Sequence, residues 1–502
     1  MQSSSRQIKL GALMSYVAIA INIVSGLLYT PWMIHSIGRD NFGLYTLALS
    51  VISLFVFDFG LSFAVERFIA KYLAENNQEK ANNCIGLVCR LYFAIDIILF
   101  VILVGVYFFI PQIYQELTPD EIEKFKVIYV MAALYSVISF PFIPVNGVLS
   151  AHEKFVQLKV CDVFHKLFIV ITMTTCLLLG YGLYALVLVN TLSGILTIIL
   201  KIYCIKKYTN QKINWRSYNS RELKEVAGYS GWVTVIALAQ RCIFNLAPSI
   251  LGVLSGSTAI AILGIAITLE GYTYTFANAI NGMFLPKVLR IVAQENGNVL
   301  PLMIKIGRLQ LYIVGLVVFG VVCLGADFIR LWVGPDFNES YLCAILIIVP
   351  SLFHLPQMIG NETIFAMNKV KKLAVVYTIM AVINLIGAAI LAKPFGAIGI
   401  SVSVCFAYIV RTIGMDVIFH KDLHIDIKQF FKKTFGALSV PMTLILLIGI
   451  VSTIFLPSNS WSLLIVKGII FVCIYCFILF LVSMNEEERQ LILKSIKKVM
   501  GK

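Results

Sequence analysis

The stretch Ile97–Gln115 reads IILFVILVGVYFFIPQIYQ and contains no charged residue. A helix needs about 20 predominantly apolar residues to cross the hydrocarbon core of a bilayer. Together with the mostly apolar residues before it, this stretch predicts a membrane-spanning helix over 82–111.

Comparable apolar stretches recur along the whole chain of 502 residues, of which 59% are apolar and only 13% charged. Soluble domains are close to half apolar and a quarter charged, so this composition predicts an all-α polytopic membrane protein. Fourteen spans are predicted, near 10–36, 42–70, 82–111, 126–150, 156–179, 182–206, 227–254, 258–291, 302–325, 341–367, 373–393, 396–420, 436–456 and 462–484.

The first span is predicted to be retained rather than cleaved as a secretory signal. The triplet Ala18-Ile19-Ala20 resembles a cleavage site, but the apolar run continues well past it to Trp32. A signal peptide has an apolar core of only about 7–15 residues.

The positive charges predict the orientation of the chain. Thirty-three of its 40 Lys and Arg residues fall in loops and helix ends on one side if both termini are cytoplasmic. Short cytoplasmic loops of membrane proteins carry such an excess. The net charge of +14 is therefore interpreted as topology, with some attraction to anionic membrane lipids, and not as nucleic-acid binding.

The chain contains a weak internal repeat. At an offset of 218, Gly38 aligns with Gly256, and Pro31 falls within one residue of Pro248. Gly182 aligns with Gly396 at an offset of 214. These matches predict two parallel six-helix lobes, and transporters built from such repeats bind substrate between the halves. The predicted division is a lobe with its linker at 1–225, a second at 226–435, helices 13 and 14 at 436–484, and a cytoplasmic amphipathic tail at 485–502.

Arg241 is the most informative polar residue, because it lies midway along the seventh predicted span. A charged side chain costs about 2.5–3.5 kcal/mol at the centre of a spanning helix on insertion scales, so it usually faces a partner or a wet cavity. Asn245, one turn later, lies on the same face. Arg241 is predicted to contact an anionic substrate in a central cavity. The alternative is an internal ion pair with Asp96 or Glu270 that only fixes the packing.

The eighth span carries a polar stripe made of Glu270, Tyr274, Asn278 and Asn281. At 100° per residue, these positions face one side of a helix. The stripe either lines a cavity for a polar or sugar-bearing cargo or forms hydrogen bonds between helices, and the sequence alone leaves both readings open.

Four further ionisable residues are candidates. Arg67 and Arg90 are weaker candidates for substrate binding, while Asp58 and Asp96 are candidates for a structural or coupling role. Asp58 and Arg67 lie on opposite faces of a straight helix, but a bend at Gly60 would allow them to pair.

Other charged residues are interpreted as structural. Asp162 precedes Lys166 by four residues, the favourable order for a pair within one helix. Arg411 is expected to extend its charge to the cytoplasmic interface and Lys467 to the outer one. In the tail, Asn485 and Glu488 stand at capping-box spacing.

Several kinds of chemistry find no support in the sequence. The 11 cysteines show no metal-ligand spacing, and no nucleotide-binding P-loop is present. No catalytic residue, metal or cofactor is therefore predicted. The external loops are short, whereas a membrane glycan polymerase or lipid-dependent glycosyltransferase needs an external catalytic platform. The chain is predicted to be a transporter and not an enzyme.

One segment resembles a known family. The run FGLY at Phe42–Tyr45, the D-x-G-L of Asp58–Leu61, and Arg67 resemble the second helix of bacterial polysaccharide-repeat-unit flippases. These are the Wzx-like O-antigen and capsule exporters of the multidrug/oligosaccharidyl-lipid/polysaccharide (MOP) superfamily. The segment DFIRLWVGPDF at Asp327–Phe337 is similar to that family's outer turn before the tenth span.

The resemblance implies a V-shaped two-lobe fold in the bacterial inner membrane. It also implies transport of a polyprenyl-diphosphate-linked oligosaccharide from the cytoplasmic to the outer leaflet, with Arg241 as a headgroup contact. A polysaccharide polymerase of the same pathway is a candidate partner. A lipid II flippase or a multidrug exporter of the same superfamily is the alternative, although drug exporters usually have twelve spans.

Overall fold

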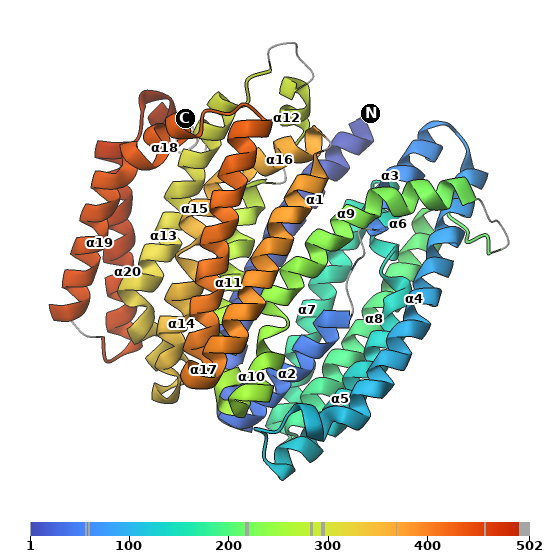
Figure 1. The fold of residues 1–502 in the computed structure, drawn as a ribbon, viewed down its shortest axis with the longest axis horizontal. Coiled ribbons are helices and arrows are strands. Elements are labelled where there is room, and N and C mark those ends of the chain that lie inside the picture. The colour runs from blue at the N-terminus through green and yellow to red at the C-terminus, as the bar shows by residue number, and fades with distance from the viewer. Residues whose placement is uncertain are drawn as a thin grey trace. The chain divides into compact units, whose positions relative to one another are not determined.

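The computed structural model describes residues 2–55, 58, 61–215, 220–281, 285–292, 297–367, 369–455 and 458–490. Within these ranges, the side chains of 2–18, 55, 63–64, 220–230, 277–281, 285–287, 289 and 454 are not described. The secondary structure of the described residues is entirely helical (Figure 1).

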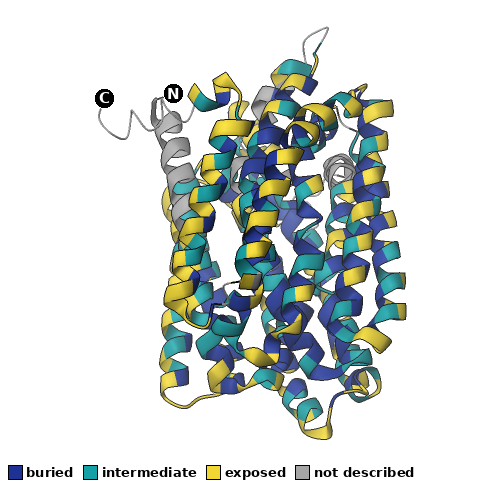
Figure 2. Ribbon diagram, turned by 90° about the vertical axis from the view of Figure 1, so that its left-hand side faces the viewer, coloured by how far each residue is buried: buried dark blue, intermediate teal, exposed yellow. Residues whose placement is uncertain are grey.

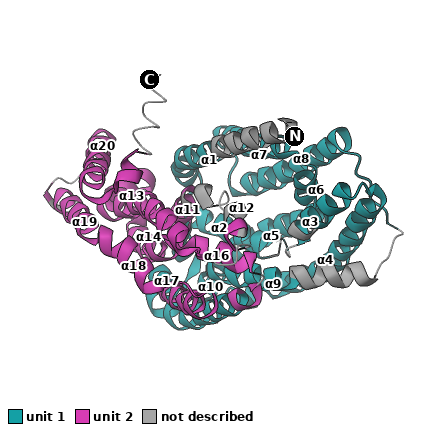
Figure 3. Cartoon of the chain, turned by 90° about the horizontal axis from the view of Figure 1, so that it is seen from above, with its two compact units in different colours: residues 1–264, 374–404 teal, residues 265–373, 405–502 magenta. Residues whose placement is uncertain are grey.

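The chain divides into two compact units (Figure 3), of which unit 1 comprises residues 1–264 and 374–404. Its elements are α1 (Gln2–Ile37), α2 (Arg39–Phe55), α3 (Leu61–Ala74), α4 (Gln78–Ile113), α5 (Pro119–Ser139), η1 (Phe140–Phe142), α6 (Val145–Ala151), α7 (Phe155–Leu178), α8 (Leu183–Tyr208), α9 (Ser220–Phe244), α10 (Ala247–Leu254), the first part of α11 (Gly256–Asn281) and the middle of α17 (Val370–Asp422).

Unit 2 comprises residues 265–373 and 405–502. Besides the remainder of α11 and both ends of α17, it holds α12 (Leu285–Val292), α13 (Leu300–Val333), η2 (Pro335–Phe337), α14 (Glu339–Ile348), α15 (Ser351–His354), η3 (Leu355–Gln357), α16 (Met358–Ala366), α18 (Ile427–Phe431), η4 (Lys432–Gly436), α19 (Ala437–Phe455), α20 (Trp461–Ile478) and η5 (Leu479–Ser483).

Among the described residues, eleven helical stretches are long and apolar enough to cross a membrane. One of them, α17, is non-helical at Gly396 (φ 54°, ψ −131°) and therefore comprises two helices. The multi-pass helical architecture predicted from the sequence is confirmed. The number fourteen and the predicted domain boundaries stay predictions.

The helices expose apolar side chains along their length. Leu28, Phe108 and Ile390 are 72%, 67% and 65% exposed, and exposed positions are not confined to the helix ends (Figure 2). In water, such a surface would be unfavourable by roughly 25 cal/mol for each Å². In a bilayer, the hydrocarbon chains cover it.

Local signals in the sequence set several helix ends. Thr118 and Glu121 form a capping box at the start of α5, which satisfies backbone N–H groups that the first turn leaves free. Gly38 and Gly256, aligned in the predicted repeat, adopt φ angles of 81° and 82°. A residue with a Cβ is disfavoured in this conformation, so glycine serves both turns.

The aligned pair Gly182 and Gly396 behaves differently. Gly396 has a positive φ, whereas Gly182 is the N-cap of α8 at φ −100°. The turn before α8 takes its positive φ at Gly180 (82°).

Candidate cargo-binding site

The second predicted span is broken in the middle. Helix α2 ends at Phe55 and α3 begins at Leu61, and Asp58 between them is not helical. Gly60, where the sequence suggested a bend, lies outside the described residues. Asp58 lies between the two helices, and its Oδ1 accepts hydrogen bonds from Ser62 N at 3.1 Å and Tyr92 Oη at 3.0 Å. A carboxylate is favourable at this position because free N–H groups and the positive end of the helix dipole meet at a helix N-terminus.

Arg241 contacts the other side of the same interruption. Its Nη1 donates a hydrogen bond to the carbonyl of Ser53, in the last turn of α2, where carbonyls have no partner within the helix. The charge of Asp58 also interacts with the Arg241 guanidinium. Asp96 and Glu270, the ion-pair partners considered from the sequence, form no ion pair with any described residue. Arg241 interacts with Asp58 and with the end of α2.

Asn245 follows the last residue of α9 and precedes α10. Its carbonyl accepts a hydrogen bond from Ser50 Oγ of α2. Arg241 and Asn245 thus both contact α2 within one turn of each other. Because Arg241 is half-buried, this contact leaves part of its side chain accessible.

Asp96 is one turn from Tyr92 on α4 and is only 8% exposed. No described residue forms a hydrogen bond with its Oδ1. A buried carboxylate without a partner is unfavourable when charged, so such a group exchanges a proton or contacts water or an ion. The structure therefore brings Asp58, Tyr92 and Arg241 together and places Asp96 on the same helix as Tyr92.

The predicted polar stripe lies on α11, in unit 2. Glu270 is 8% exposed and Tyr274 is 39% exposed, and no described residue pairs with the Glu270 carboxylate. The side chains of Asn278 and Asn281 lie outside the described residues. Of the weaker candidates, Arg67 is exposed on α3 and Arg90 is half-buried on α4.

Three expected structural roles are wrong. Asp162 pairs with Lys201 of α8 at 3.0 Å and with Lys159 at 3.5 Å instead of with Lys166. Arg411 is 3% exposed and does not reach an interface. Lys467 Nζ lies 3.7 Å from Asp327 Oδ2, where its side chain is 11% exposed. For Arg411 and Lys467, burial within the protein replaces access to water.

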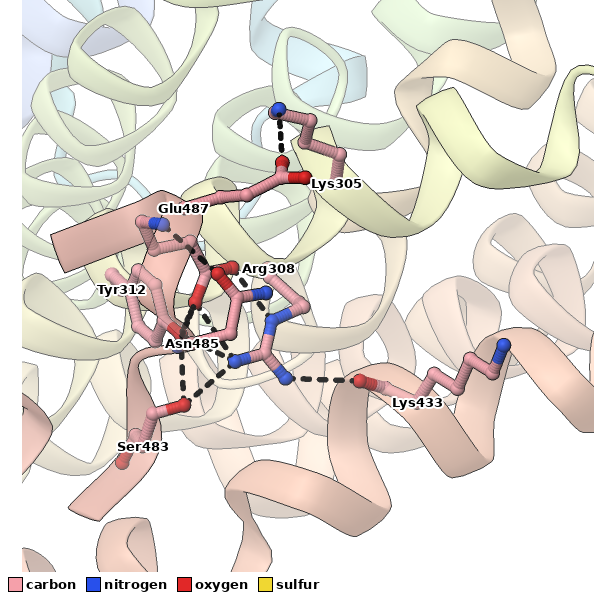
Figure 4. Close-up of polar contacts among 8 residues, drawn as sticks. Lys305, Arg308, Tyr312, Lys433, Ser483, Asn485 and Glu487 are labelled. Atoms are coloured by element: carbon pink, nitrogen blue, oxygen red, sulfur yellow. Dashed lines mark hydrogen bonds and ion pairs between the residues drawn. The ribbon is translucent and has the colours of Figure 1, made fainter. Parts of the chain in front are cut away.

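Unit 2 contains an ionic cluster that the sequence predicted only in part (Figure 4). The capping box of Asn485 and Glu488 is confirmed, with backbone-to-side-chain hydrogen bonds of 2.9 Å in both directions. Its partner from α13 was not predicted: Arg308 Nε and Nη2 donate to the two Glu488 oxygens at 2.7 and 2.9 Å.

We call this cluster the C-terminal clasp; it consists of Arg308, Tyr312, Lys433, Ser483, Asn485 and Glu488. Arg308 also donates to the carbonyls of Ser483 and Lys433, at 2.7 and 3.1 Å. Burial raises the pKa of Glu488, but the hydrogen bonds from Arg308 and the Asn485 backbone lower it further, so it lies below the usual glutamate value. The clasp therefore holds an ionised pair and joins the segment after α20 to α13.

Comparisons with known proteins identify the fold. A lipid II flippase, MurJ, in an inward closed conformation has a TM-score of 0.71 at 13% identity, covering 93% of this chain and 97% of MurJ. An inward-facing multidrug resistance MATE family transporter of the MOP superfamily has a TM-score of 0.62 at 14% identity, covering 82% and 96%. The chain therefore has the fold of MOP-superfamily transporters.

The chain is also 22% identical over 515 residues to the "Uncharacterized membrane protein EpsK" of Bacillus subtilis (strain 168), covering 96% of this chain and 97% of that protein. The family described as "Polysaccharide biosynthesis protein" matches residues 10–292. This match spans more than half of the chain. It confirms that the sequence resembles a family of polysaccharide biosynthesis proteins. The protein is a multi-pass membrane transporter that belongs to the polysaccharide biosynthesis protein family.

Proposed function

We propose that this protein moves a polyprenyl-diphosphate-linked oligosaccharide repeat unit from the cytoplasmic to the outer leaflet of the bacterial inner membrane. In this proposal, fourteen spans form two six-helix lobes and two appended helices, with both termini in the cytoplasm. The two lobes expose a central site alternately to the two sides. The pathway is that of O-antigen, capsule or another surface glycan.

The observation that carries the proposal is a transporter fold in a polysaccharide biosynthesis family, with a half-buried arginine beside the gap between α2 and α3. Broken membrane helices supply free backbone groups and dipole ends at the depth where transporters bind substrate. Arginine suits the diphosphate because its planar guanidinium donates two parallel hydrogen bonds to a phosphate group.

We assign Arg241 as the diphosphate contact. Its hydrogen bond to the Ser53 carbonyl uses Nη1, and a guanidinium carries five N–H donors. Arg241 is half-buried, so part of its side chain is accessible to a substrate. The passage for the sugars is proposed to be lined by Asn245, Glu270, Tyr274, Asn278 and Asn281. Arg67 and Arg90 are proposed to add positive charge for the diphosphate.

Asp96 and Asp58 are the candidates for coupling to an ion. Asp96 has the stronger support, because its carboxylate is buried without a hydrogen-bond partner for Oδ1 among the described residues. Asp58 accepts two hydrogen bonds, which supports a structural role at the start of α3.

The second candidate function is the transport of a different cargo on the same fold. MurJ is a lipid II flippase and the MATE protein a multidrug transporter by their names, so lipid II or a drug is an alternative cargo on the same fold. A membrane glycan polymerase has less support, because the fold is that of transporters.

Cells that lack the protein test the proposal. They are expected to accumulate a lipid-linked glycan that an impermeant glycan-modifying enzyme cannot reach from outside. Cells with Arg241→Ala should accumulate the same species, and Arg241→Lys should restore part of the transport. Thermal unfolding of both purified variants separates loss of transport from loss of the Ser53 contact. Accumulation of no lipid-linked species in the deletion strain would contradict the proposal.

A further inference from the structure

The segment Lys201–Trp215 contains four lysines and no acidic residue; it reads KIYCIKKYTNQKINW. It covers the end of α8 and the following loop. Lys201 donates to Asp162 at 3.0 Å and to Asn146 at 3.0 Å, so its charge is compensated. Lys206, Lys207 and Lys212 are exposed and form no ion pair with any described residue. We call these three residues the lysine patch.

The end of α8 holds two of these lysines beside aromatic rings. Lys206 and Lys207 lie in its last turn, where a positive charge is favourable at the negative end of the helix dipole. Lys207 Nζ lies 5.5 Å from the centre of the Tyr203 ring and 5.4 Å from that of Tyr208. Both tyrosines are about half-exposed.

The loop 209–215, which we call the strap, holds the third lysine. Asn82 Oδ1 of α4 accepts hydrogen bonds from Lys212 N and Gln211 Nε2, both at 2.9 Å. Asn214 Nδ2 donates to Asn83 Oδ1 at 2.7 Å. The backbone of Lys212 is therefore fixed against α4 while its side chain stays exposed.

The strap approaches α4 closely because Gly86 has no side chain: a Cβ there would lie 1.9 Å from Asn214 O. The strap ends on an aromatic contact. The Trp215 ring lies 5.7 Å from that of Phe93, and both rings are about half-exposed. The patch thus combines ammonium groups that form no ion pair with any described residue and exposed aromatic rings on a defined backbone.

We propose that the lysine patch binds the phosphate headgroup of an anionic phospholipid in the cytoplasmic leaflet. Tyrosine and tryptophan favour the depth of the headgroups. Each lysine near an anionic membrane surface contributes about a fivefold gain in binding. The inference depends on the orientation predicted from the charge distribution, but not on the identity of the cargo.

The full-length protein tests this directly. It is reconstituted into nanodiscs of phosphatidylcholine and phosphatidylglycerol, released into detergent, and its retained phosphatidylglycerol is counted by native mass spectrometry. The variant K206Q/K207Q/K212Q is expected to retain at least tenfold less than the wild type. The control K428Q/K432Q/K433Q removes the same charge from a segment that also carries Asp422 and Asp426, and should change retention less than twofold.

An equal loss of retained phosphatidylglycerol in both variants would overturn the inference, because it would mean that any cytoplasmic positive charge binds the lipid equally well. A second arm adds a polyprenyl diphosphate without sugars as competitor. If it displaced phosphatidylglycerol from the wild type at far lower concentration, and did so only with the patch intact, the patch would serve the cargo headgroup instead. Since both arms measure binding, failure of glycan transport would leave this result unaffected.

Discussion

Asp40 accepts a hydrogen bond of 2.9 Å from Thr258, and these two residues stand at the 218-residue offset of the predicted internal repeat. Thr46 and Gly264 stand at the same offset, and a Cβ on Gly264 would lie 3.1 Å from the Thr46 side chain. Residues that contact their own equivalents lie on the two-fold axis of a repeat. If the predicted repeat holds, its axis passes between α2 and the start of α11, in unit 1.

A disulfide across this contact should stop transport. In the proposed mechanism the cargo passes between the two lobes, so equivalent residues that meet on the axis separate before release. The double variant Asp40→Cys/Thr258→Cys is expected to cross-link under oxidation, to lose at least about tenfold in transport and to regain it with reductant. Cross-linking is scored on a non-reducing gel after protease cleavage in the linker that follows Trp215.

The two single-cysteine variants and the wild type, treated with the same oxidant, control for the native cysteines. Complete cross-linking with undiminished transport would show that the α2–α11 contact stays closed throughout the cycle.

Gly43 should tolerate no side chain. A Cβ at Gly43 would lie 2.2 Å from the Ser257 carbonyl oxygen, whereas one at Gly105 meets nothing within 4 Å. Gly43→Ala is expected to lower the free energy of unfolding by about 1–3 kcal/mol, the usual cost of overpacking. Gly105→Ala should leave it unchanged or raise it by up to about 1 kcal/mol, because alanine favours the helix. Thermal unfolding in detergent compares them, and equal losses would refute the close approach.

The C-terminal clasp should contribute strongly to the free energy of unfolding of unit 2. Removing one partner of a buried ion pair leaves the other charge without compensation, at about 3–5 kcal/mol. Glu488 and Arg308 have 3% and 9% exposed side chains, so Glu488→Ala should destabilise unit 2 by roughly this amount. The neighbouring Glu487 pairs with Lys305 at 2.9 Å, but its side chain is 76% exposed. Glu487→Ala therefore serves as the matched control and should change little.

The clasp also predicts a pH dependence. A carboxyl whose pKa is lower in the folded state stabilises the fold at pH values above its unfolded pKa, and this contribution is lost as the pH falls through the folded pKa. The pKa of Glu488 lies below the usual glutamate value. The stability difference between wild type and Glu488→Ala should therefore be constant from pH 5 to pH 8 and shrink only below about pH 4.5. A difference that grew on acidification would contradict this assignment.

The variant Asp96→Asn should distinguish a role of Asp96 in ion coupling from a role in the packing of α4. The carboxylate is buried and its Oδ1 has no hydrogen-bond partner among the described residues, so its neutral isostere removes an unfavourable burial. We expect unchanged or higher thermal stability together with reduced transport. Loss of stability in this variant would instead assign Asp96 to the packing of α4.

The sequence was sufficient for the features that depend on local pattern. The apolar runs and the capping box of Asn485 and Glu488 follow from residues within a few turns of one another. The partners of charged residues were not predictable in this way. Arg308 pairs with Glu488, which is 180 residues away in the sequence. Asp162 pairs with Lys201 and not with Lys166, because α7 packs against α8. These pairings depend on which helices lie next to one another in the fold. The periodicity of a single sequence does not reveal those neighbours.

The same limit applies to the candidate site. The sequence identified Arg241 from its depth, but the contact with Ser53 at the end of α2 requires the break in that helix and the position of α9 beside it. Asn278 and Asn281 continue the predicted stripe on α11, and their side chains lie outside the described residues.

Transport of a lipid-linked glycan in liposomes measures the proposed activity of the protein itself. Purified protein is reconstituted with a fluorescent polyprenyl-diphosphate oligosaccharide, and the fraction that an external reductant can quench is followed over time. The wild type is expected to equilibrate the lipid between leaflets, while Arg241→Ala does so at least about tenfold more slowly. A wild-type protein that left the glycan in place and instead transported a cationic dye would be a drug exporter and not a glycan flippase.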